Sequence, residues 1–347
     1  MDRRSFLRTT AFAVTAAGGS SFLIGCAPST GNSTRPSGNP NLPEAVFVTP
    51  FQHITNYADV YVAIQEGYFA EAGIRVTPVG GTGTASSISQ VAAGQGLFGK
   101  AASVITCPLI ADNNTEIITV AHGDHRSQYS VASDPAKPLT DPAQWQGKTI
   151  GVISKGGTTE LLLDAMSVAK GLDPKNVRKV VTGADVGSLE FLRRGEVDGF
   201  ITFIGSEAAF KQRKIDLHYL NTDEFAKMPG DSYFVKKADV QSKGDAIAGF
   251  LRASRRGFEF VEKPENLDRV LNAIGAFNKV EVSDRELAKL KVEAQPVICK
   301  PADGAKYLSV DLPAWESALE LMRKSGIVKD RSRPITDFVT SQFVDAL

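Results

Sequence analysis

The residue types and spacing best suited to chemistry occur in one short stretch of two glycines and two threonines: Gly156, Gly157, Thr158 and Thr159. A β-branched run at residues 149–153 precedes them, and residues 160–166 carry apolar side chains at helical spacing. This order predicts a strand, a tight turn and a helix whose first N–H groups are free. Such a helix end binds carboxylate, sulfonate, phosphate or carbonyl oxygens. An ordinary capped turn without a ligand is an equal alternative.

No metal or nucleophile motif accompanies this turn. The chain has four histidines and three cysteines, without C-x-x-C spacing or a pair of histidines spaced as metal ligands on one helix. It contains neither a Gly-x-Ser-x-Gly elbow nor a Walker-type phosphate loop. We therefore expect no catalytic residue, no metal and no cofactor.

Composition limits the class of protein. With 347 residues, of which 42% are hydrophobic and 8% aromatic, the chain is too long for one ordinary domain and predicts two lobes. Its formal net charge is zero, and residues 1–25 contain three arginines and one aspartate, so the remainder carries −2. A nearly neutral surface argues against nucleic acid or an anionic membrane as a partner. A small molecule is the expected ligand.

The N-terminus is typical of an export signal. Arg3 and Arg4 precede a weakly apolar run, residues 11–24, which is too short and too polar to span a membrane. The Arg-Arg-x-Phe-Leu core resembles a twin-arginine signal, although general secretion remains open. The Leu-x-Gly-Cys sequence ending at Cys26 resembles a lipobox, whose cysteine is acylated and becomes the new N-terminus. We expect removal of residues 1–25 and a lipidated, flexible tether over residues 26–43.

From residue 44 onward, strands, glycine loops and helices alternate. Strands are predicted at residues 45–49, 74–79 and 97–101, and helices at residues 59–70 and 86–93. A second glycine turn contains Gly81 and Thr82. This order predicts an α/β lobe with a largely parallel sheet, whose loops at the carboxyl edge gather the ligand.

Several motifs along the chain resemble one family, the periplasmic solute-binding proteins of nitrate, sulfonate, taurine and thiamine-pyrimidine ABC importers. These motifs are Tyr61-Val-Ala with Gly67-Tyr-Phe, Ala92-Ala-Gly with Phe98-Gly, Gly147-Lys-Thr-Ile-Gly-Val, Leu192-Arg-Arg-Gly with Val197-Asp, Ile327-Val-Lys, and Ile335-Thr-Asp-Phe with Phe343. Leu97 replaces an acidic residue that the family usually has. The resemblance implies a type II periplasmic-binding-protein fold, in which two α/β lobes joined by a two-strand hinge close on a ligand.

The same resemblance predicts the domain boundaries. Lobe 1 would contain residues 44–122 and 236–347, and lobe 2 would contain residues 123–235. The chain would cross between the lobes at residues 117–126 and return near residues 232–237.

The family's cleft also suggests ligand contacts. His122 and His125 fall in the expected crossing, although a structural role is commoner for a lone imidazole. Phe203 ends a predicted strand where the family often has Trp followed by Glu and Pro; the acid is missing here, which favours a ligand different from that of the family's amino-pyrimidine branch. We interpret Cys107 and Cys299 as core residues, although export permits a disulfide between them. The expected ligand-binding residues are His53, Asn56, Gly81, Thr82, Ala102, Ser103, His122, His125, Gly157, Thr158, Thr159 and Phe203.

The resemblance implies a non-enzymatic, monomeric receptor held on the outer face of the cytoplasmic membrane or in the periplasm. It would capture a small organic solute and deliver it to an ABC permease and its ATPase. Sulfonate, pyrimidine precursor, nitrate and aromatic carboxylate all remain open as ligands. Two alternatives are an enzyme on the same fold, of the pyrimidine synthase or desulfinase type, and a sensory solute-binding lipoprotein.

Overall fold

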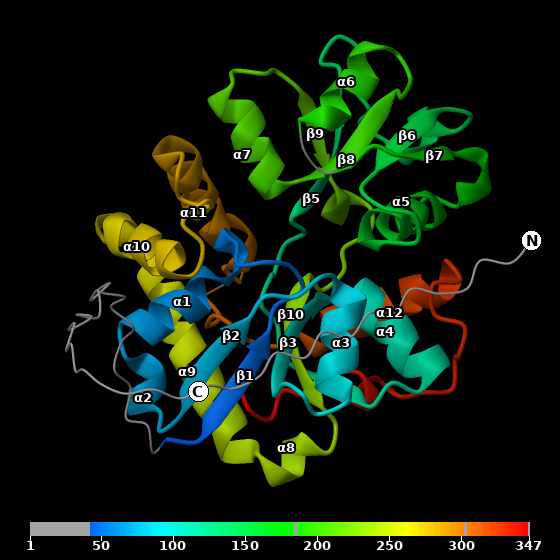
Figure 1. The fold of residues 1–347 in the computed structure, drawn as a ribbon. Helices are drawn as coiled ribbons and strands as arrows, with labels where there is room; N and C mark the ends of the chain where they lie inside the picture. Colours follow the sequence, from blue (N-terminus) through cyan, green and yellow to red (C-terminus); the bar gives the residue numbers. More distant parts are fainter. Residues whose placement is uncertain (1–41, 184–185, 302–303, 346–347) are drawn as a thin grey trace, which may run out of the picture. The chain divides into compact units, whose positions relative to one another are not determined.

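The computed structural model describes residues 42–183, 186–301 and 304–345, which form two five-stranded sheets with helices packed around them (Figure 1). The first sheet has the order β2-β1-β3-β10-β4 and the second has the order β7-β6-β8-β5-β9. The strands of the first sheet are β1 (Glu44–Val48), β2 (Arg75–Val79), β3 (Phe98–Ala102), β4 (Ile117–Ala121) and β10 (Asp231–Lys236). The strands of the second are β5 (Tyr129–Ser133), β6 (Thr149–Val152), β7 (Arg178–Val181), β8 (Gly199–Phe203) and β9 (His218–Asn221).

The helices follow the alternating order that the sequence predicts. The α-helices are α1 (Ala58–Gln65), α2 (Tyr68–Glu71), α3 (Thr84–Ala92), α4 (Ser103–Asn113), α5 (Thr158–Ala169), α6 (Gly187–Arg193), α7 (Ile204–Gln212), α8 (Asp239–Ser242), α9 (Gly244–Val261), α10 (Leu267–Phe277), α11 (Arg285–Cys299) and α12 (Leu312–Lys324). Short 3-10 turns are η1 (Thr55–Tyr57), η2 (Pro142–Trp145), η3 (Pro174–Asn176), η4 (Thr222–Glu224), η5 (Pro264–Asn266) and η6 (Ile335–Asp337).

The chain crosses between the two sheets twice. It leaves β4 and enters β5 through residues 122–128, and it returns from β9 to β10 through residues 222–230. In each sheet the strand that follows a crossing, β5 or β10, runs antiparallel to its neighbours. Two α/β lobes joined by two crossings are the arrangement predicted for the type II periplasmic-binding-protein fold.

The return crossing lies earlier in the chain than the sequence predicts. The expected boundaries place residues 231–235 in the second lobe and the return near residues 232–237. In the structure β10 instead pairs with β3 and β4 inside the first sheet, so the connection between the lobes ends at Gly230. The run Ser232-Tyr-Phe-Val indicates a strand, but alternation of side chains does not reveal which sheet a strand joins.

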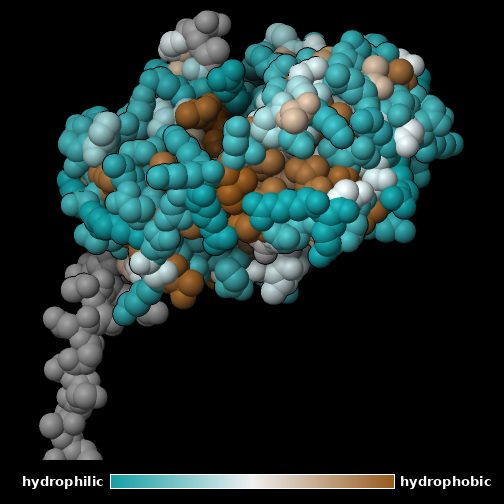
Figure 2. All heavy atoms as spheres, turned by 90° about the horizontal axis from the view of Figure 1, so that it is seen from above, coloured by the Kyte–Doolittle hydropathy of each residue, from teal (hydrophilic) through white to brown (hydrophobic). Residues whose placement is uncertain are grey.

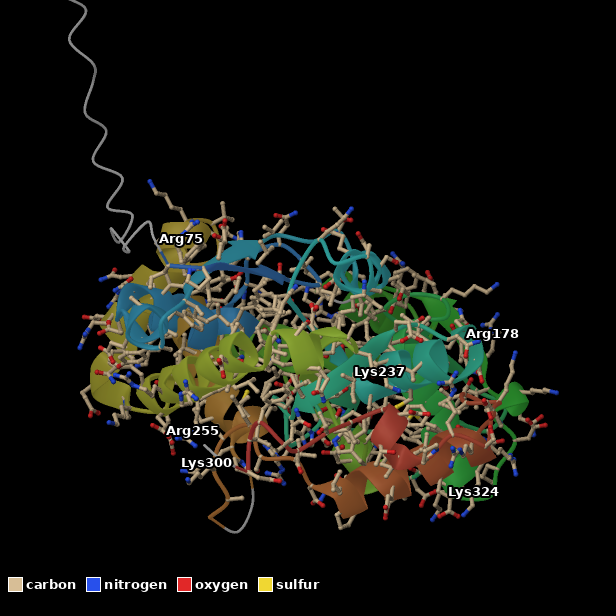
Figure 3. All side chains as sticks on the ribbon, turned by 90° about the horizontal axis from the view of Figure 1, so that it is seen from below. Arg75, Arg178, Lys237, Arg255, Lys300 and Lys324 are labelled. Carbon is tan, nitrogen blue, oxygen red and sulfur yellow. The ribbon has the colours of Figure 1, made fainter. Side chains whose placement is uncertain are left out.

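The described surface is mainly hydrophilic, with hydrophobic side chains gathered near the middle of the face seen in Figure 2. The basic side chains labelled in Figure 3 come from separate elements. Several pair with a nearby carboxylate, as in Arg75–Glu44 (3.1 Å) and Lys324–Glu320 (2.7 Å). Such exposed pairs contribute little to stability and leave the charges mixed over the surface.

No helix in the described part of the chain is long and apolar enough to cross a membrane. The predicted signal peptide, Cys26 and most of the tether lie outside the described residues.

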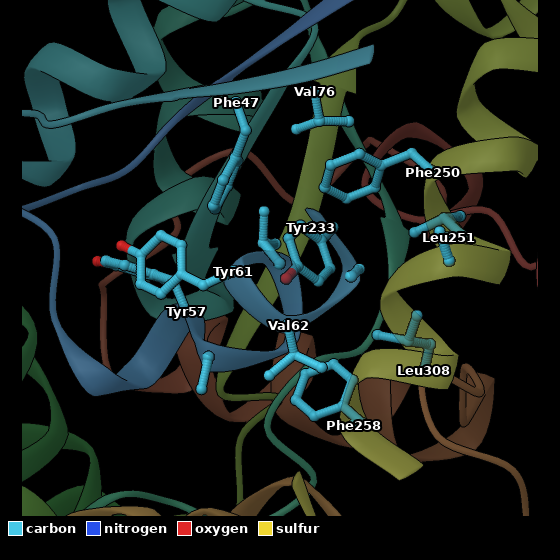
Figure 4. Close-up of a cluster of buried hydrophobic side chains, with 14 of the residues drawn as sticks. Phe47, Tyr57, Tyr61, Val62, Val76, Tyr233, Phe250, Leu251, Phe258 and Leu308 are labelled. Atoms are coloured by element: carbon cyan, nitrogen blue, oxygen red, sulfur yellow. The ribbon is translucent and has the colours of Figure 1, made fainter. Parts of the chain in front are cut away.

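An aromatic core stabilises the first lobe. Phe250 of α9 stacks on Phe98 of β3, with ring centroids 3.8 Å apart. Phe250 also packs against Phe47 of β1 and Tyr233 of β10 (Figure 4). All four side chains are fully buried. Burying one such ring contributes about 1.5–3 kcal/mol. This core therefore gives the loops at the carboxyl ends of β1 and β3 a rigid base.

A second core joins the two lobes on one side. It contains Val48 of β1, Ile150 of β6, Leu162 of α5 and Trp315 of α12 in one continuous cluster of buried side chains. Helix α5 contacts both α4 and α12 there. Cys107 belongs to the same cluster, and both Cys107 and Cys299 are buried and unpaired, which confirms their interpretation as core residues.

Candidate functional site

A small cavity lies between the two lobes, beside both crossings. Its volume is about 20 Å³, which is enough for one water molecule. A larger solute therefore requires the lobes to move apart before it can enter. The lining residues come from both sheets, from the first turns of α4 and α5 and from both crossings: Ala102, Val104, Ser127, Gln128, Tyr129, Thr158, Leu162, Asp223, Met228, Pro229, Gly230 and Asp231.

Asp231 stands at the centre of a hydrogen-bonded chain that connects three elements. It is the first residue of β10 and lies opposite Ala102 of β3. Gln128, in the first crossing, donates from Nε2 to Asp231 Oδ2 at 3.3 Å. Asn56 of η1 donates from Nδ2 to Gln128 Oε1 at 3.1 Å. These two bonds fix the orientation of the Gln128 amide and bring Asn56 to the site through Gln128.

The electrostatic surroundings favour the protonated form of Asp231. Burial raises the pKa of its carboxyl group, and the neighbouring carboxylate of Asp124 raises it further, while Lys100 opposes both effects. Lys100 is itself held elsewhere, because its Nζ lies 3.3 Å from Asp124 Oδ1 and both side chains are almost fully buried. Among the residues that the structure describes, Asp231 therefore has no ion-pair partner of its own.

The aromatic side chain of Tyr129 lies near this acid. Tyr129 of β5 pairs in register with Phe203 of β8, and a side-chain hydrogen bond joins Tyr129 to Thr158. Burial, with the charge of Asp231 nearby, raises the pKa of the Tyr129 hydroxyl, so this group stays protonated and can donate. Thr158 and Phe203, both predicted ligand contacts, thus both adjoin Tyr129.

Two backbone N–H groups at the glycine turn before α5 donate hydrogen bonds to side chains of the first turn of α5. Thr159 is buried, and its Oγ1 accepts from Ile153 N at 3.1 Å. The carboxylate of Glu160, in the first turn of α5, accepts from Gly156 N at 2.5 Å. The left-handed backbone falls on Gly156, with φ of 67°, whereas Gly157 has φ of −88°. Glu160 already occupies part of the helix end that the sequence predicts for a ligand anion.

The predicted ligand-binding residues Gly81, Thr82, Ala102 and Ser103 of the first lobe differ in their burial and in their contacts. Gly81 is packed so tightly that a Cβ atom there would lie 2.0 Å from Thr49 O, so this loop needs glycine. Thr82 beside it is exposed. Ser103 is fully buried and donates from Oγ to Pro229 O at 2.7 Å, which ties α4 to the return crossing. Ala102 is the predicted residue of this lobe that lines the cavity itself.

The three predicted histidines lie away from the cavity. His53 Nδ1 is 3.0 Å from the Tyr61 hydroxyl, and burial lowers the pKa of this histidine. The rings of His122 and His125 lie 4.3 Å apart, and His122 packs near Trp315 of α12. Burial lowers the pKa of His122 to about 3 and that of His125 to about 4, so both rings are neutral at physiological pH. Ligand contacts by these histidines stay predictions.

Sequence reasoning missed the polar residues of the cavity: Ser127, Gln128, Tyr129, Asp223 and Asp231. One signal could have indicated Asp231, namely a lone acid directly before the apolar strand run Ser232-Tyr-Phe-Val, since an acid at the end of a strand often lies at the edge of a sheet. Within the described ranges, no group of three or more His, Cys, Asp or Glu side chains could hold a metal ion.

Comparison with known proteins gives one curated relative with a stated ligand. It is the formylaminopyrimidine-binding protein of Halalkalibacterium halodurans, 25% identical over 301 residues, which cover 80% of this chain and 86% of the relative.

Solved structures with the same fold include both binding proteins and enzymes. The periplasmic aliphatic sulphonate binding protein SsuA from Escherichia coli superposes with a TM-score of 0.67 at 10% identity, covering 87% of this chain and 93% of that one. The desulfurization enzyme DSZB superposes with a TM-score of 0.56 at 11% identity, covering 88% of this chain and 98% of that one. At these identities the likeness establishes the fold alone.

The family model described as NMT1/THI5 like matches residues 54–266, which include both crossings and the whole second sheet. The chain belongs to the NMT1/THI5-like family.

Proposed function

We propose that this chain is the solute-binding component of an ABC importer and that it captures a small organic solute between its two lobes. The observation that carries this proposal is the cavity, whose lining comes from both lobes and both crossings. A solute held there contacts both lobes at once and so stabilises their closed arrangement relative to the open one. The stated ligand of the curated relative, a formylaminopyrimidine, supports a small organic solute.

The contacts between the lobes suit reversible closure. On the α7 side they include polar contacts: Gln212 at the end of α7 donates from Nε2 to both carboxylate oxygens of Asp284, at 2.8 and 3.0 Å, and half-buried Ile204 of α7 packs against the first lobe's core. On the α5 side they belong to the shared apolar core. Exposed hydrogen bonds exchange with water at small net cost, whereas exposing apolar core costs roughly 25 cal/mol per Å². Opening on the α7 side therefore requires less free energy.

Binding is favoured over catalysis because the polar groups of the cavity lack a base–nucleophile pair. Ser127 is a possible nucleophile by residue type, but its Oγ already accepts from Thr222 Oγ1 at 2.7 Å and from Tyr129 N at 3.1 Å. Histidine is absent from the residues that line the cavity. The carboxylate of Asp223 accepts from the backbone N of Ser127, but among the described residues no hydrogen bond joins Ser127 Oγ to a carboxylate or an imidazole that could activate it.

We further propose that the protein is exported and anchored through a lipid on Cys26, which would hold it beside a permease on the outer face of the cytoplasmic membrane. The lipobox-like sequence and the twin-arginine-like segment support this proposal.

A thermal-shift screen of the purified protein against pyrimidines, alkyl sulfonates, nitrate and aromatic carboxylates tests the function. A binding solute raises the unfolding temperature because it stabilises the folded state alone. We expect one class to do so and to be recovered unchanged after incubation. Chemical conversion of that solute by the protein would favour an enzyme instead.

A further inference from the structure

The two crossings are hydrogen-bonded to each other at their first-lobe ends. Asp124 N donates to Asp231 O at 2.9 Å, and Gly230 N donates to Asp124 O at 3.2 Å. The Asp124 carboxylate also forms the buried ion pair with Lys100 of β3. These contacts satisfy the backbone where both crossings meet the first sheet, and they fix residues 124 and 230 to the first lobe.

The attachment to the first lobe reaches one step further in each crossing. Arg126 N donates to Ile298 O near the end of α11 at 3.0 Å, and Ile298 belongs to the first lobe's core. In the second crossing, Pro229 O accepts from the N–H and the hydroxyl of Ser103, at 3.1 and 2.7 Å. Ser103 begins α4, which follows β3. Arg126 and Pro229 are therefore held by the first lobe.

Asp223 holds the other ends of both crossings. Its carboxylate accepts from Ser127 N at 2.7 Å and also from Met228 N. Ser127 is held a second time, because Asn221 of β9 donates from Nδ2 to Ser127 O at 3.0 Å. Asp223 belongs to η4, which packs against α5 and β5 of the second lobe. One carboxylate thus ties a residue of each crossing to the second lobe.

We propose that the lobes open and close by rotation at two peptide links, Arg126–Ser127 and Met228–Pro229, and that Asp223 is the positioning residue that keeps these links together. This inference rests on the proposed solute-binding function, of which lobe closure is a part. In each link, one residue is bonded to the first lobe and the next residue along the chain, or the one before it, is bonded to the second lobe. A hinge consists of the few residues that absorb the change in φ and ψ.

Gln128 spans the first link. Its backbone O accepts from Ile204 N of α7 at 2.9 Å, on the second-lobe side. Its side chain bonds to Asp231 and Asn56 of the first lobe. Rotation at the link moves the Gln128 backbone relative to both side-chain partners, so these two bonds hold the closed arrangement and break on opening.

The two links differ in backbone freedom, which decides where the proposal is tested. The ring of Pro229 fixes its φ and also restricts Met228 before it. The first link has no such restriction. The Arg126 side chain is exposed and is not among the residues that line the cavity, so it can be removed without a direct effect on a solute.

Distances between the lobes are measured by double electron–electron resonance in the solute-free, full-length protein. Spin labels are placed at Lys211→Cys on α7 and Lys279→Cys after α10, two exposed positions in different lobes. Cys26→Ser removes the cysteine of the tether. Cys107 and Cys299 are buried and so are shielded from the label.

The test compares Arg126→Gly with Arg126→Ala. Both variants lose the same exposed side chain, and glycine alone frees the backbone at the link. An open hinge samples more backbone conformations than a closed one, so we expect longer and more broadly distributed distances in the glycine variant. The open fraction should rise about two- to fivefold relative to the alanine variant.

His125→Gly and His125→Ala form the matched control pair. His125 lies between Asp124 and Arg126, which are both bonded to the first lobe, so added backbone freedom there does not separate the lobes. We expect the two control variants to give the same distances.

The positioning role of Asp223 is tested in the same labelled protein. Asp223→Ala removes the acceptor of both backbone bonds and should broaden the distances, whereas Asp223→Asn retains one side-chain oxygen and should broaden them less. Asp216→Ala, which changes an exposed acid of the same lobe, should match the unsubstituted protein. Urea unfolding of each variant separates lobe movement from lost stability, because destabilisation alone leaves the distances in folded molecules unchanged.

The outcomes separate the hinge from the proposed function. Equal distances in Arg126→Gly and Arg126→Ala, or a larger effect of glycine at residue 125 than at residue 126, would overturn the assignment of the links. Unchanged distances in Asp223→Ala would overturn its positioning role. Because every measurement is made without solute, the expected distances together with a failed solute screen would contradict solute binding and leave the hinge standing.

Discussion

Gln128 donates a hydrogen bond to Asp231 across 103 positions of sequence. This contact ties the first crossing to the strand that follows the second, and it does so at the cavity wall. A change of lobe orientation requires the backbone of these two crossings to move. A solute that contacts Asp231 therefore also acts on the hinge. If the proposed site binds the solute, ligand recognition and lobe movement are coupled at this contact.

Thr158 and Thr159 are adjacent in sequence but should respond differently to substitution. Thr158 lines the cavity, so Thr158→Ala should lower solute affinity by about two- to tenfold. Thr159 is buried and accepts from Ile153 N, so Thr159→Ala should cost about 0.5–1.5 kcal/mol of folding stability and leave affinity within about twofold. Calorimetry and urea unfolding of both variants check this. The reverse pattern would show that Thr159 contacts the solute.

Gln212 should influence the balance between open and closed lobes. Gln212→Ala removes both hydrogen bonds to Asp284. Asp284 itself is not substituted, because it is also the N-cap of α11. We expect a shift of about 0.5–1 kcal/mol toward the open state and a two- to fivefold loss of affinity. Small-angle scattering of the solute-free protein should report a larger radius of gyration. Gln65→Ala, on the exposed end of α1, is the control, and an equal effect there would contradict the account.

Asp59 should make folding stability depend on pH. Burial raises the pKa of its carboxyl group to about 6, against an ordinary value near 3.8, although Lys100 and the Tyr233 hydroxyl oppose this. A carboxyl group whose pKa is higher in the folded state disfavours folding once it ionises, so stability should fall as pH rises from about 4 to 6. The full cost at pH 7 is about 3 kcal/mol, at 1.36 kcal/mol per unit.

Asp59→Asn removes this ionisation. The variant should gain stability relative to wild type between pH 4 and pH 7, measured by urea unfolding at several pH values. A difference between the two proteins that stays constant over this range would show that Asp59 does not titrate there.

The lipid anchor is tested independently of the ligand. Cys26→Ser should move the protein from the membrane fraction to the soluble exported fraction, because acylation requires the cysteine thiol. Solute affinity should not change. Recovery of the variant in the membrane pellet at the wild-type level would contradict lipidation at this residue.

Local sequence signals predicted the elements well, and the fold and family are confirmed. Strand β6, the glycine turn and α5 follow from the strand run, the two glycines and the helical spacing of residues 160–166, all within one short stretch. The hydrogen bond from Gly156 N to the Glu160 carboxylate was not predicted from the sequence, because it depends on the geometry of the folded turn. Gly157→Asp would accordingly test packing as much as any ligand, because a Cβ atom at residue 157 would lie 2.2 Å from Ser154 Oγ.

The strand run could have indicated the position of Asp231, but the surroundings of this acid could not be predicted because they depend on distant partners. Asp231 acquires its position from β3, its hydrogen bond from Gln128 and its electrostatic environment from Asp124 and Lys100. These residues come from separate segments of the chain, and no spacing rule connects them. His122 and His125 are close in sequence and in space, and His122 packs toward α12, so ligand contacts by these histidines stay predictions.

Hydrogen–deuterium exchange with and without a saturating solute tests most directly whether the solute binds between the lobes. We predict slower exchange in three segments at once: residues 127–131 at the first crossing and the start of β5, residues 158–162 in the first turns of α5, and the start of β10 in the first lobe. Protection restricted to one lobe, or to the α7–α11 surface, would contradict a solute site between the lobes.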